Sequence, residues 1–284
     1  MAKRARNKRL TILQAAVFLI IAILSVIELP KFFGSGLTLY AFDVGQADSY
    51  LFHFPDGTNV LVDAGTRKSG PSLASRLRRL GVEKIDIAVA THPHEDHIGG
   101  MAEIIKEFPI ERFWDSGYNH GSEVQRSMLE SIRDKRIRFE RPKAGHREPI
   151  GDALIEVIAP AKAIRGTNSD ANNNSIVLRV TYKDVSFLMT GDMEEAERRS
   201  VGKFPRATVL KIAHHGSANG TDERFLKEVS PDIAILSYGR GNSYGHPHRK
   251  VTDLLRKYGV RAYSTADGEV RLETDGRTIT AEQR

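Results

Sequence analysis

The stretch THPHEDHIGG, residues 91–100, constrains the fold and the chemistry of this chain more than any other part of the sequence. It places His92, His94, Asp96 and His97 within six positions, directly after the apolar run KIDIAVA, which predicts a strand that ends at the motif. Imidazoles crowded at a strand end would lose hydration without gaining partners, whereas a divalent cation would use each neutral ring as a ligand. The motif therefore predicts a metal site on a loop that a sheet holds rigidly.

Three further features of the sequence bear on that site. Cysteine is absent, so histidine and carboxylate must supply the ligands of any transition metal. Asp192 ends the apolar run FLMTGD, and its two oxygens can each bind one ion, which predicts a dinuclear centre with ions about 3.5–4 Å apart. Seven of the ten histidines fall in three motifs that follow apolar runs: His92, His94 and His97; His214 and His215; His246 and His248.

The shorter histidine motifs also allow structural interpretations. The pair His214 and His215 would suit a pH-sensitive contact or a hydrogen-bonded turn, and the YGHPH motif could be structural as well. The isolated histidines, His53, His120 and His146, are interpreted as ordinary surface residues. Only the first cluster is dense enough to require a metal.

From residue 37 onward, short strand-like and helix-like segments alternate. LTLYAFDV, SYLFHF and NVLVDAG predict an antiparallel meander with a turn at Pro55-Asp56-Gly57, and no repeat or long linker divides the chain after it. Residues 37–284 therefore predict one α/β domain in which two sheets are covered outside by helices. The helices are expected near residues 71–81, 101–108, 122–135, 194–200, 222–228 and 250–258.

The N-terminal residues predict a membrane anchor. Residues 1–9 form a basic tail, residues 10–29 an apolar stretch, and residues 30–36 a linker. Twenty helical residues reach roughly 30 Å, about one hydrocarbon thickness. The basic flank should stay in the cytoplasm, which places residues 37–284 on the outer face of a cell membrane with a single span. A cleaved signal peptide or a buried core helix are the alternatives.

The basic tail also explains the overall charge. Of the formal net charge of +6, the tail carries +5, so residues 10–284 net only +1 (6 − 5 = 1). Overall basicity is therefore weak support for a DNA-binding surface, although a local basic stripe would still fit a neutral average.

Seven motifs resemble a known family in their order along the chain. They are FDVGQADS (42–49), LVDAG (61–65), THPHEDHIGG (91–100), NNNSIVLRV (172–180), FLMTGD (187–192), LKIAHHGS (210–217) and NSYGHPH (242–248). The HxHxDH pattern with a later Asp is similar to the metallo-β-lactamase fold, and the whole set resembles the extracytoplasmic domain of ComEC competence proteins. The resemblance implies a four-layer αββα sandwich and a membrane-associated hydrolase of DNA phosphodiesters, with two Zn²⁺ or Mn²⁺ ions and an unspecified competence or channel partner.

The resemblance and the motif spacing together assign roles. His92, His94 and Asp192 would hold one ion with Asn173 or a neighbouring Asn nearby, because no His lies between His146 and His214. Asp96, His97, Asp192 and His214 would hold the second. Asp96 is also assigned to the catalytic set, with His215 as a donor to developing charge and His246 and His248 as groups that protonate the leaving oxygen or bind phosphate. Asp63 is expected to orient a ligand His, and Asp48 is the better of two further acidic candidates.

Two other functions fit the same motifs. Cell-wall choline-phosphate esterases look similar around the HxHxDH and HHG elements, so a wall ester or another small-molecule ester is an alternative substrate. A non-catalytic DNA-binding module is a third possibility, although such a module would not need the full ligand set. ComEC proteins carry many more membrane spans than this chain, so transport is not inferred.

Overall fold

A computed structural model describes residues 36–284 of the protein. The basic tail, the predicted anchor and all but the last residue of the linker lie outside the described residues. Within residues 36–284, no helix is both long enough and apolar enough to cross a membrane.

The first sheet mixes antiparallel and parallel strands. Strands β1, β2 and β3 form the predicted antiparallel meander, and the strands from β3 to β6 run parallel to one another. The C-terminal hairpin completes the sheet, because β14 pairs antiparallel with β1. The strands, in the spatial order of the sheet, are β15 (Ile279–Gln283), β14 (Val270–Thr274), β1 (Leu37–Ala41), β2 (Tyr50–His53), β3 (Asn59–Val62), β4 (Ile85–Ala90), β5 (Ile110–Asp115) and β6 (Arg138–Glu140).

The second sheet also combines an antiparallel part with a parallel part. Strands β7 to β10 are antiparallel, and β10 to β13 are parallel. In spatial order they are β13 (Arg261–Ser264), β12 (Ile233–Leu236), β11 (Val209–Lys211), β10 (Val185–Met189), β9 (Val177–Tyr182), β8 (Ala153–Ala159) and β7 (Arg147–Ile150).

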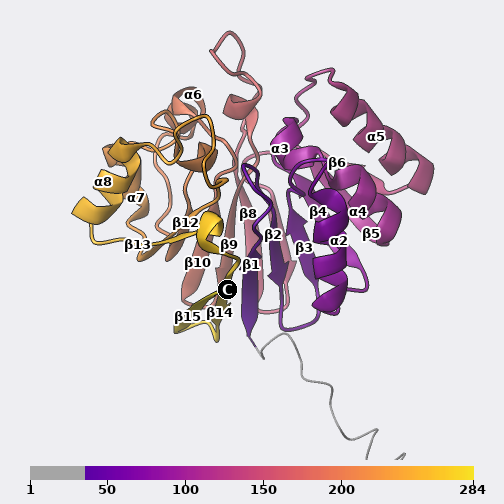
Figure 1. Ribbon diagram of the computed structural model, residues 1–284, viewed down its shortest axis with the longest axis horizontal. Coiled ribbons are helices and arrows are strands. Elements are labelled where there is room, and N and C mark those ends of the chain that lie inside the picture. Colours follow the sequence, from indigo (N-terminus) through magenta and orange to yellow (C-terminus); the bar gives the residue numbers. More distant parts are fainter. Residues whose placement is uncertain (1–35) are drawn as a thin grey trace, which may run out of the picture. The chain divides into compact units, whose positions relative to one another are not determined.

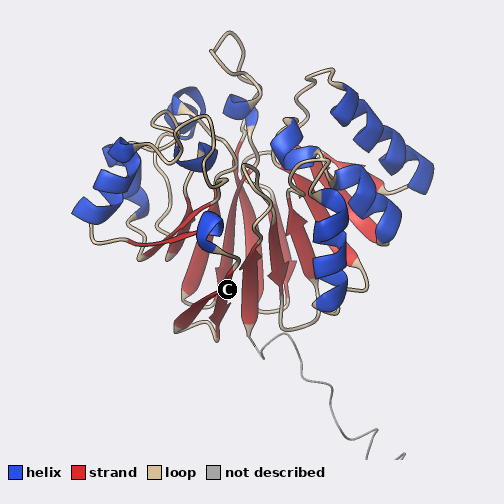
Figure 2. Cartoon of the chain, viewed as in Figure 1, coloured by secondary structure: helices blue, strands red, loops and turns tan. Residues whose placement is uncertain are grey.

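Helices cover the outer faces of both sheets (Figures 1 and 2). The helices on the first sheet are α2 (Gly70–Arg79), α3 (Glu95–Ile98), α4 (Met101–Glu107) and α5 (Glu123–Lys135). Those on the second are α6 (Glu195–Val201), α7 (Glu223–Val229) and α8 (Arg249–Lys257). Three single turns, η1 (Asn172–Asn174), η2 (His214–Gly216) and η3 (Thr265–Asp267), lie in loops.

The hydrophobic core has three layers that fit this arrangement. One cluster lies between the sheets and joins Phe52 of the first to Phe187 of the second, whose rings meet edge to face at 5.6 Å. A second cluster lies under α2, α4 and α5, and a third under α6, α7 and α8. Three apolar layers separate four structural layers, so the described residues form the predicted αββα sandwich.

The sequence pattern did not predict two of the strands, and a third strand is shorter than its pattern indicates. The strands β6 and β7 are short, polar and at sheet edges, where one side is solvated and alternation is lost. The apolar pattern of TVLKIAHHG predicts one continuous strand, but β11 ends at Lys211 and His214–Gly216 forms a turn.

The predicted site motifs come together because of strand direction. Residues 91–97 follow β4, Asp192 follows β10, His214 follows β11 and His246 follows β12. Each of these strands belongs to a parallel stretch of its sheet, so the loops after them leave from carboxyl ends. The core between the sheets brings the two sets of loops to one edge of the sandwich.

Candidate metal centre

Asp192 lies at the middle of the candidate centre. Its carboxylate is buried, and one oxygen, Oδ2, faces the Nε2 atoms of four histidines. The distances to that oxygen are 3.3 Å from His97, 3.5 Å from His215, 3.8 Å from His214 and 3.9 Å from His92. The structure therefore brings together residues from three of the predicted motifs, which are separated by up to 123 positions (215 − 92 = 123).

One side of Asp192 gathers a complete ligand set. Ligand atoms of Asp96, His97, Asp192 and His215 all lie within 4.8 Å of one another. His215 Nε2 is 3.2 Å from Asp96 Oδ2, and His97 Nε2 is 4.0 Å from the same oxygen. The motifs and the family resemblance predict His214 at this position and His215 as a donor to developing charge, whereas the structure places His215 here.

The remaining histidines of the centre lie close to this ligand set. His92 Nε2 is 3.0 Å from His94 Nδ1. His214 Nε2 is 3.8 Å from the same Asp192 oxygen as His215 Nε2, and the planes of the His214 and His215 rings are inclined by 66°. Two adjacent histidines thus face one carboxylate oxygen.

Of the asparagines predicted to lie near the first ion, the structure places Asn172 at the pocket rather than Asn173. Asn173 Oδ1 accepts the Glu197 backbone N–H at 3.0 Å, and its Nδ2 donates to Thr167 and to the Ser169 carbonyl. Its neighbour Asn172 faces the pocket instead, with Nδ2 3.2 Å from Glu194 Oε1 and a buried Oδ1 that has no hydrogen-bond partner. The single turn η1 rotates these successive side chains to different sides.

Hydrogen bonds at Nδ1 aim three of the histidines at the centre. His97 Nδ1 is 2.7 Å from Asp63 Oδ2, as expected for an orienting carboxylate. His214 Nδ1 is 3.0 Å from Glu194 Oε1, and His215 Nδ1 is 2.8 Å from the Ser237 carbonyl. An acceptor at Nδ1 fixes the proton there and leaves the Nε2 lone pair free for a cation.

A buried nitrogen without a hydrogen-bond partner indicates whether a cation fits the centre. His97 Nε2 is fully buried and lacks a hydrogen-bond partner, which is costly unless another group engages it. Carboxylate oxygens of Asp192 and Asp96 lie 3.3 and 4.0 Å from it, as co-ligands of one cation would. This donor set therefore fits divalent metal.

Backbone strain accompanies this arrangement. His214, His215 and Gly216 adopt left-handed φ values of 49°, 51° and 87°, and Asp63 has a φ of 58°. Such values are rare for residues with a side chain and concentrate at functional sites. At Gly216 a side chain would also overlap Pro247. The left-handed turn is what lets two consecutive histidines face one carboxylate, and no sequence pattern predicted it.

A buried lysine completes the centre and was missed from the sequence. Lys211 is 1% exposed, and its Nζ lies 2.5 Å from Asp48 Oδ2 and 3.4 Å from Asp192 Oδ1. It also donates to the Gly191 carbonyl at 2.7 Å. A charged residue within the apolar run TVLKIA was the available signal. Lys211 holds one Asp192 oxygen and leaves the other for the histidines.

In the metal-free protein, two histidines of the centre are protonated. Burial opposes a charge on His97, but the carboxylates of Asp192 and Asp63 raise its pKa well above the ordinary value. Burial also opposes a charge on His215, and Asp192 and Asp48 nevertheless raise its pKa to about 10. Burial lowers the pKa of His92 well below its usual range. Two imidazolium ions thus balance the buried carboxylates.

A dependence of stability on pH follows for the metal-free protein. The folded pKa values of His97 and His215 exceed the unfolded value of about 6.5. Their contribution is fully present below about pH 6.5 and is lost as the pH rises toward about 10. We expect the melting temperature in EDTA to fall across this range, and the fall to shrink once Mn²⁺ or Zn²⁺ displaces the protons. A melting temperature in EDTA that stays flat or rises there would contradict the assignment of these protons.

An open pocket leads to the centre. Asp96, Asp192, His214 and His215 form its floor, and the rim residues are Gln46, Thr66, His94, Glu95, Asn172, Tyr244 and His246. Gly239 N–H donates to Gln46 Oε1 at 3.0 Å, so Gln46 Nε2 faces His246 Nδ1 at 3.3 Å and donates to it. Burial, followed by the nearby His214 and His215, lowers the pKa of His246 to about 4. His246 is therefore a neutral ring whose proton is on Nε2.

His248 and His120 make contacts that the motifs did not predict. His248 Nδ1 accepts the Ala218 backbone N–H at 2.9 Å, and the ring lies behind His246 rather than in the pocket wall. This contact braces the loop after the histidine pair, and the catalytic role of His248 stays a prediction. His120 is exposed as expected, but its ring contacts that of His94 at 5.3 Å.

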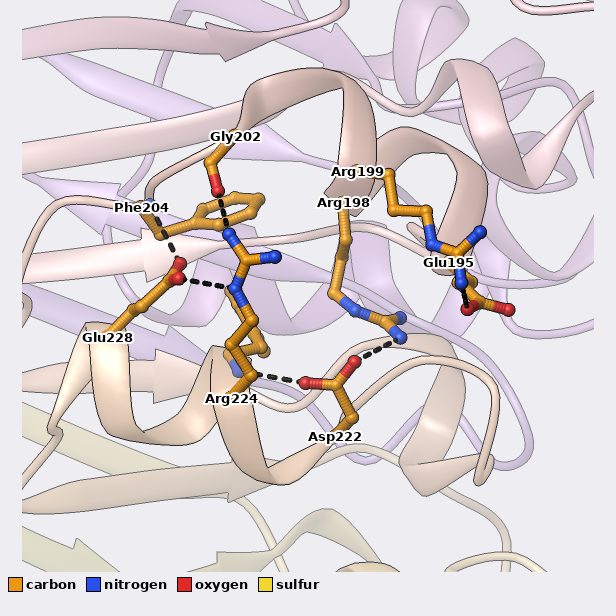
Figure 3. A pocket seen from close by; sticks show the side chains of 9 residues that line it. Glu195, Arg198, Arg199, Gly202, Phe204, Asp222, Arg224 and Glu228 are labelled. Carbon is orange, nitrogen blue, oxygen red and sulfur yellow. Dashed lines mark hydrogen bonds and ion pairs between the residues drawn. The ribbon is translucent and has the colours of Figure 1, made fainter.

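A separate pocket between α6 and α7 lacks the features of a reaction site (Figure 3). Its arginines are paired: Arg198 Nη2 lies 2.9 Å from Asp222 Oδ2, and Arg224 Nε 2.8 Å from Glu228 Oε1. Arg198 also donates to the Asn219 and Gly220 carbonyls and thereby holds the loop after the histidine pair. We interpret this pocket as a support of the centre.

Comparison with known proteins agrees with this geometry. The sequence profile of the family described as "Metallo-beta-lactamase superfamily" matches residues 42–240, a range that contains Asp192 and the histidines around it. ComE operon protein 3 of Bacillus subtilis (strain 168) is 30% identical over 243 residues, which cover 78% of this chain and 31% of that protein. Competence protein ComA of Neisseria gonorrhoeae is 29% identical over 228 residues, covering 78% and 30%.

These similarities cover only part of the related proteins, so the functions of the whole relatives do not carry over to this chain. The chain spans about a third of the length of these curated relatives. Among solved structures, the diiron beta-hydroxylase CmlA of Streptomyces venezuelae aligns with a TM-score of 0.57 and 13% identity, covering 84% of this chain and 54% of that one. At that identity the likeness shows the fold alone.

Proposed function

Because the chain belongs to the metallo-beta-lactamase superfamily, we propose that it is a metal-dependent phosphodiesterase that cuts DNA at the outer face of a membrane. The family accounts for a metal-dependent hydrolase; the substrate and the location are proposed. The observation that carries the proposal is the convergence of four histidine Nε2 atoms on Oδ2 of Asp192 at 3.3–3.9 Å. Imidazoles that converge on one carboxylate oxygen in this way suit a site for divalent cations.

Two divalent cations are proposed, one on each side of Asp192. His92, His94 and His214 would hold the first, and Asp96, His97 and His215 the second, with Asp192 shared. Imidazole and carboxylate ligands without thiolate suit Zn²⁺ or Mn²⁺. When bound, the ions would neutralise phosphate oxygens and lower the pKa of water to about 7.

The residues around the centre would orient the metal ligands and hold the substrate. Asp63, Glu194 and the Ser237 carbonyl keep three ligand rings in the required tautomer. Lys211 keeps Asp192 from rotating, because it engages the second oxygen. His246, neutral and protonated at Nε2, would donate a hydrogen bond to a phosphate oxygen or to the leaving group.

A DNA substrate is supported by the chemistry and by the relatives. Two divalent cations that neutralise phosphate oxygens would favour an anionic substrate over a neutral lactam or ester. The similar proteins include one named a competence protein, and the basic tail followed by an apolar stretch at residues 1–29 supports a membrane-bound protein that would work with a competence or channel partner.

A matrix of metals and substrates tests the proposal on the full-length protein in detergent. After chelation and reloading with Mn²⁺ or Zn²⁺, we expect turnover of single-stranded DNA and bis-p-nitrophenyl phosphate, and little of a phosphocholine ester or nitrocefin. Turnover of nitrocefin alone would exclude both phosphodiester functions, and turnover of the phosphocholine ester alone would point to a wall substrate. Near-zero bound metal with full DNA affinity would indicate a non-catalytic DNA-binding module.

A further inference from the structure

An exposed aromatic ring stands at the mouth of the candidate centre. Tyr244 is 66% exposed, the most exposed of the large hydrophobic side chains in the described part of the chain. Its ring lies nearly parallel to that of His246, with the centroids 5.6 Å apart and the planes inclined by 19°. One face of the phenol ring therefore rests on an imidazole.

The turn that carries Tyr244 is braced by one side chain. Asn242 Oδ1 accepts the backbone N–H groups of Tyr244 at 3.1 Å and His246 at 3.0 Å. Asn242 Nδ2 donates to the carbonyls of Gly239 at 3.0 Å and His246 at 2.7 Å. Because both amide ends are used, the turn is held in shape before any ligand arrives. Such bracing is unexpected for an aromatic residue that merely covers a surface.

A ladder of rings connects Tyr244 to the centre. His246, which supports Tyr244, itself stacks on His215 with a centroid distance of 6.3 Å and an inclination of 27°. Gln46 fixes the plane of His246 from the opposite sheet through the hydrogen bond at Nδ1. Tyr244 is thus two ring spacings from a proposed metal ligand and lines the same pocket. A group stacked on Tyr244 would lie beside the reacting phosphate rather than over it.

We propose that Tyr244 is a stacking platform for a nucleobase that adjoins the scissile phosphodiester. This inference rests on the proposed function and names the part of the substrate that the centre itself does not contact. A planar base extends the ladder of rings, since aromatic side chains bind single-stranded bases through their π-faces without sequence preference. The phosphate attached to that nucleoside would then reach the pocket floor at Asp192.

The pocket favours a base over a choline group. Quaternary ammonium ligands are typically enclosed in cages of several aromatic rings. Among the described residues that line this pocket, Tyr244 is the sole Phe, Tyr or Trp, and one face rests on His246. A single flat face suits a planar ring.

Binding of two oligonucleotides tests the platform. The full-length protein, in detergent and EDTA to prevent cleavage, is titrated into a fluorescent single-stranded deoxythymidine oligonucleotide and its abasic analogue, and anisotropy is measured. Tyr244→Ala should raise the Kd of the intact oligonucleotide about tenfold, which is the size of effect expected for loss of one base-stacking ring. The Kd of the abasic analogue should be the same for the variant and the wild type. Tyr244→Phe should bind both like the wild type.

Tyr258→Ala is the matched control. Tyr258 is a partly exposed tyrosine at the end of α8, outside the pocket, and should leave both Kd values unchanged when replaced. The platform is refuted if Tyr244→Ala weakens intact and abasic binding equally, or weakens neither. It is also refuted if phosphocholine displaces the intact oligonucleotide from the wild type but not from Tyr244→Ala, because the ring would then serve choline.

Hydrolysis separates this inference from the proposed function. If the wild type cleaves the intact and abasic oligonucleotides with equal kcat/KM and KM, the platform is wrong and the phosphodiesterase stands. If Tyr244-dependent preference for the intact oligonucleotide appears in binding but no phosphodiester is cleaved with any metal, Tyr244 still stacks on a base, while the phosphodiesterase and the scissile position of that base are wrong.

Discussion

The Asp192→Asn variant is expected to take up little metal and to lose more than about a hundredfold of the hydrolytic rate. Loss of a residue that only orients a ligand typically costs about 10–100-fold in metal affinity or activity. Asp192 is the proposed ligand of both ions, and its Oδ2 is the common neighbour of four imidazoles. Its replacement should therefore exceed that range. Asparagine preserves the shape of the side chain but removes the negative charge that two cations would share.

The variant should be measured in two ways. Bound metal is determined after reloading and desalting, and hydrolysis of bis-p-nitrophenyl phosphate is followed in the same samples. Asp134→Asn is the matched control, because Asp134 is exposed on α5 and contacts only its neighbour Arg133 among the ion pairs of the described residues. Wild-type metal content in Asp192→Asn would show that the cations bind elsewhere, and equal losses in the two variants would show a general effect of removing a carboxylate.

Much of the fold was predictable because its strands carry strong local patterns. KIDIAVA is an apolar run of strand length and forms β4 with its boundary within one residue. IERFWD mixes apolar and charged residues in a strand-like segment and forms β5. The antiparallel meander of β1 to β3 followed from a turn signal between alternating runs. Edge strands lacked that pattern because solvent on one side relaxes the demand for apolar residues.

The sequence predicted which residues form the site better than it predicted how they are arranged. The residues of the HxHxDH motif and Asp192 converge as expected because they follow strands whose carboxyl ends meet. The roles of His214 and His215 depended on a left-handed turn that the sequence pattern did not predict, since a positive φ is uncommon for any residue other than glycine. The choice between Asn172 and Asn173 likewise depended on the rotation of a single turn, η1. Local backbone conformation, not composition, decided these assignments.

The spacing of the motifs did not identify three supporting residues of the centre, because each acts through another residue. These are Gln46, Glu194 and Lys211. Gln46 contacts His246 across 200 positions, and Glu194 orients His214 from the start of α6. Lys211 is different, because a lysine inside a buried strand is itself an anomaly that requires a partner. That partner is Asp48, the better of the two further acidic candidates in the sequence.

Replacing Lys211 by methionine should lower the free energy of unfolding by about 3–5 kcal/mol, the usual cost of breaking a buried ion pair by removing one partner. Methionine is similar in length but leaves the buried Asp48 carboxylate without the cation 2.5 Å away. Burial opposes the charge on Asp48, and Lys211 is the first of the groups that hold its pKa well below the ordinary range. Urea unfolding in EDTA measures the change without a contribution from bound metal.

A double variant distinguishes loss of the ion pair from loss of packing. Lys211→Met combined with Asp48→Asn should be more stable than Lys211→Met alone, because no unpaired charge then remains. Lys84→Met is the control: Lys84 Nζ lies 2.6 Å from Asp86 Oδ1, but its side chain is 60% exposed, so solvent replaces the partner and stability should change far less. If Lys211→Met and Lys84→Met were equally stable, or if the double variant recovered nothing, Lys211 would not be the counter-charge of the centre. A buried cation would then be an incidental neighbour of Asp192 rather than the group that presents one of its oxygens to the histidines.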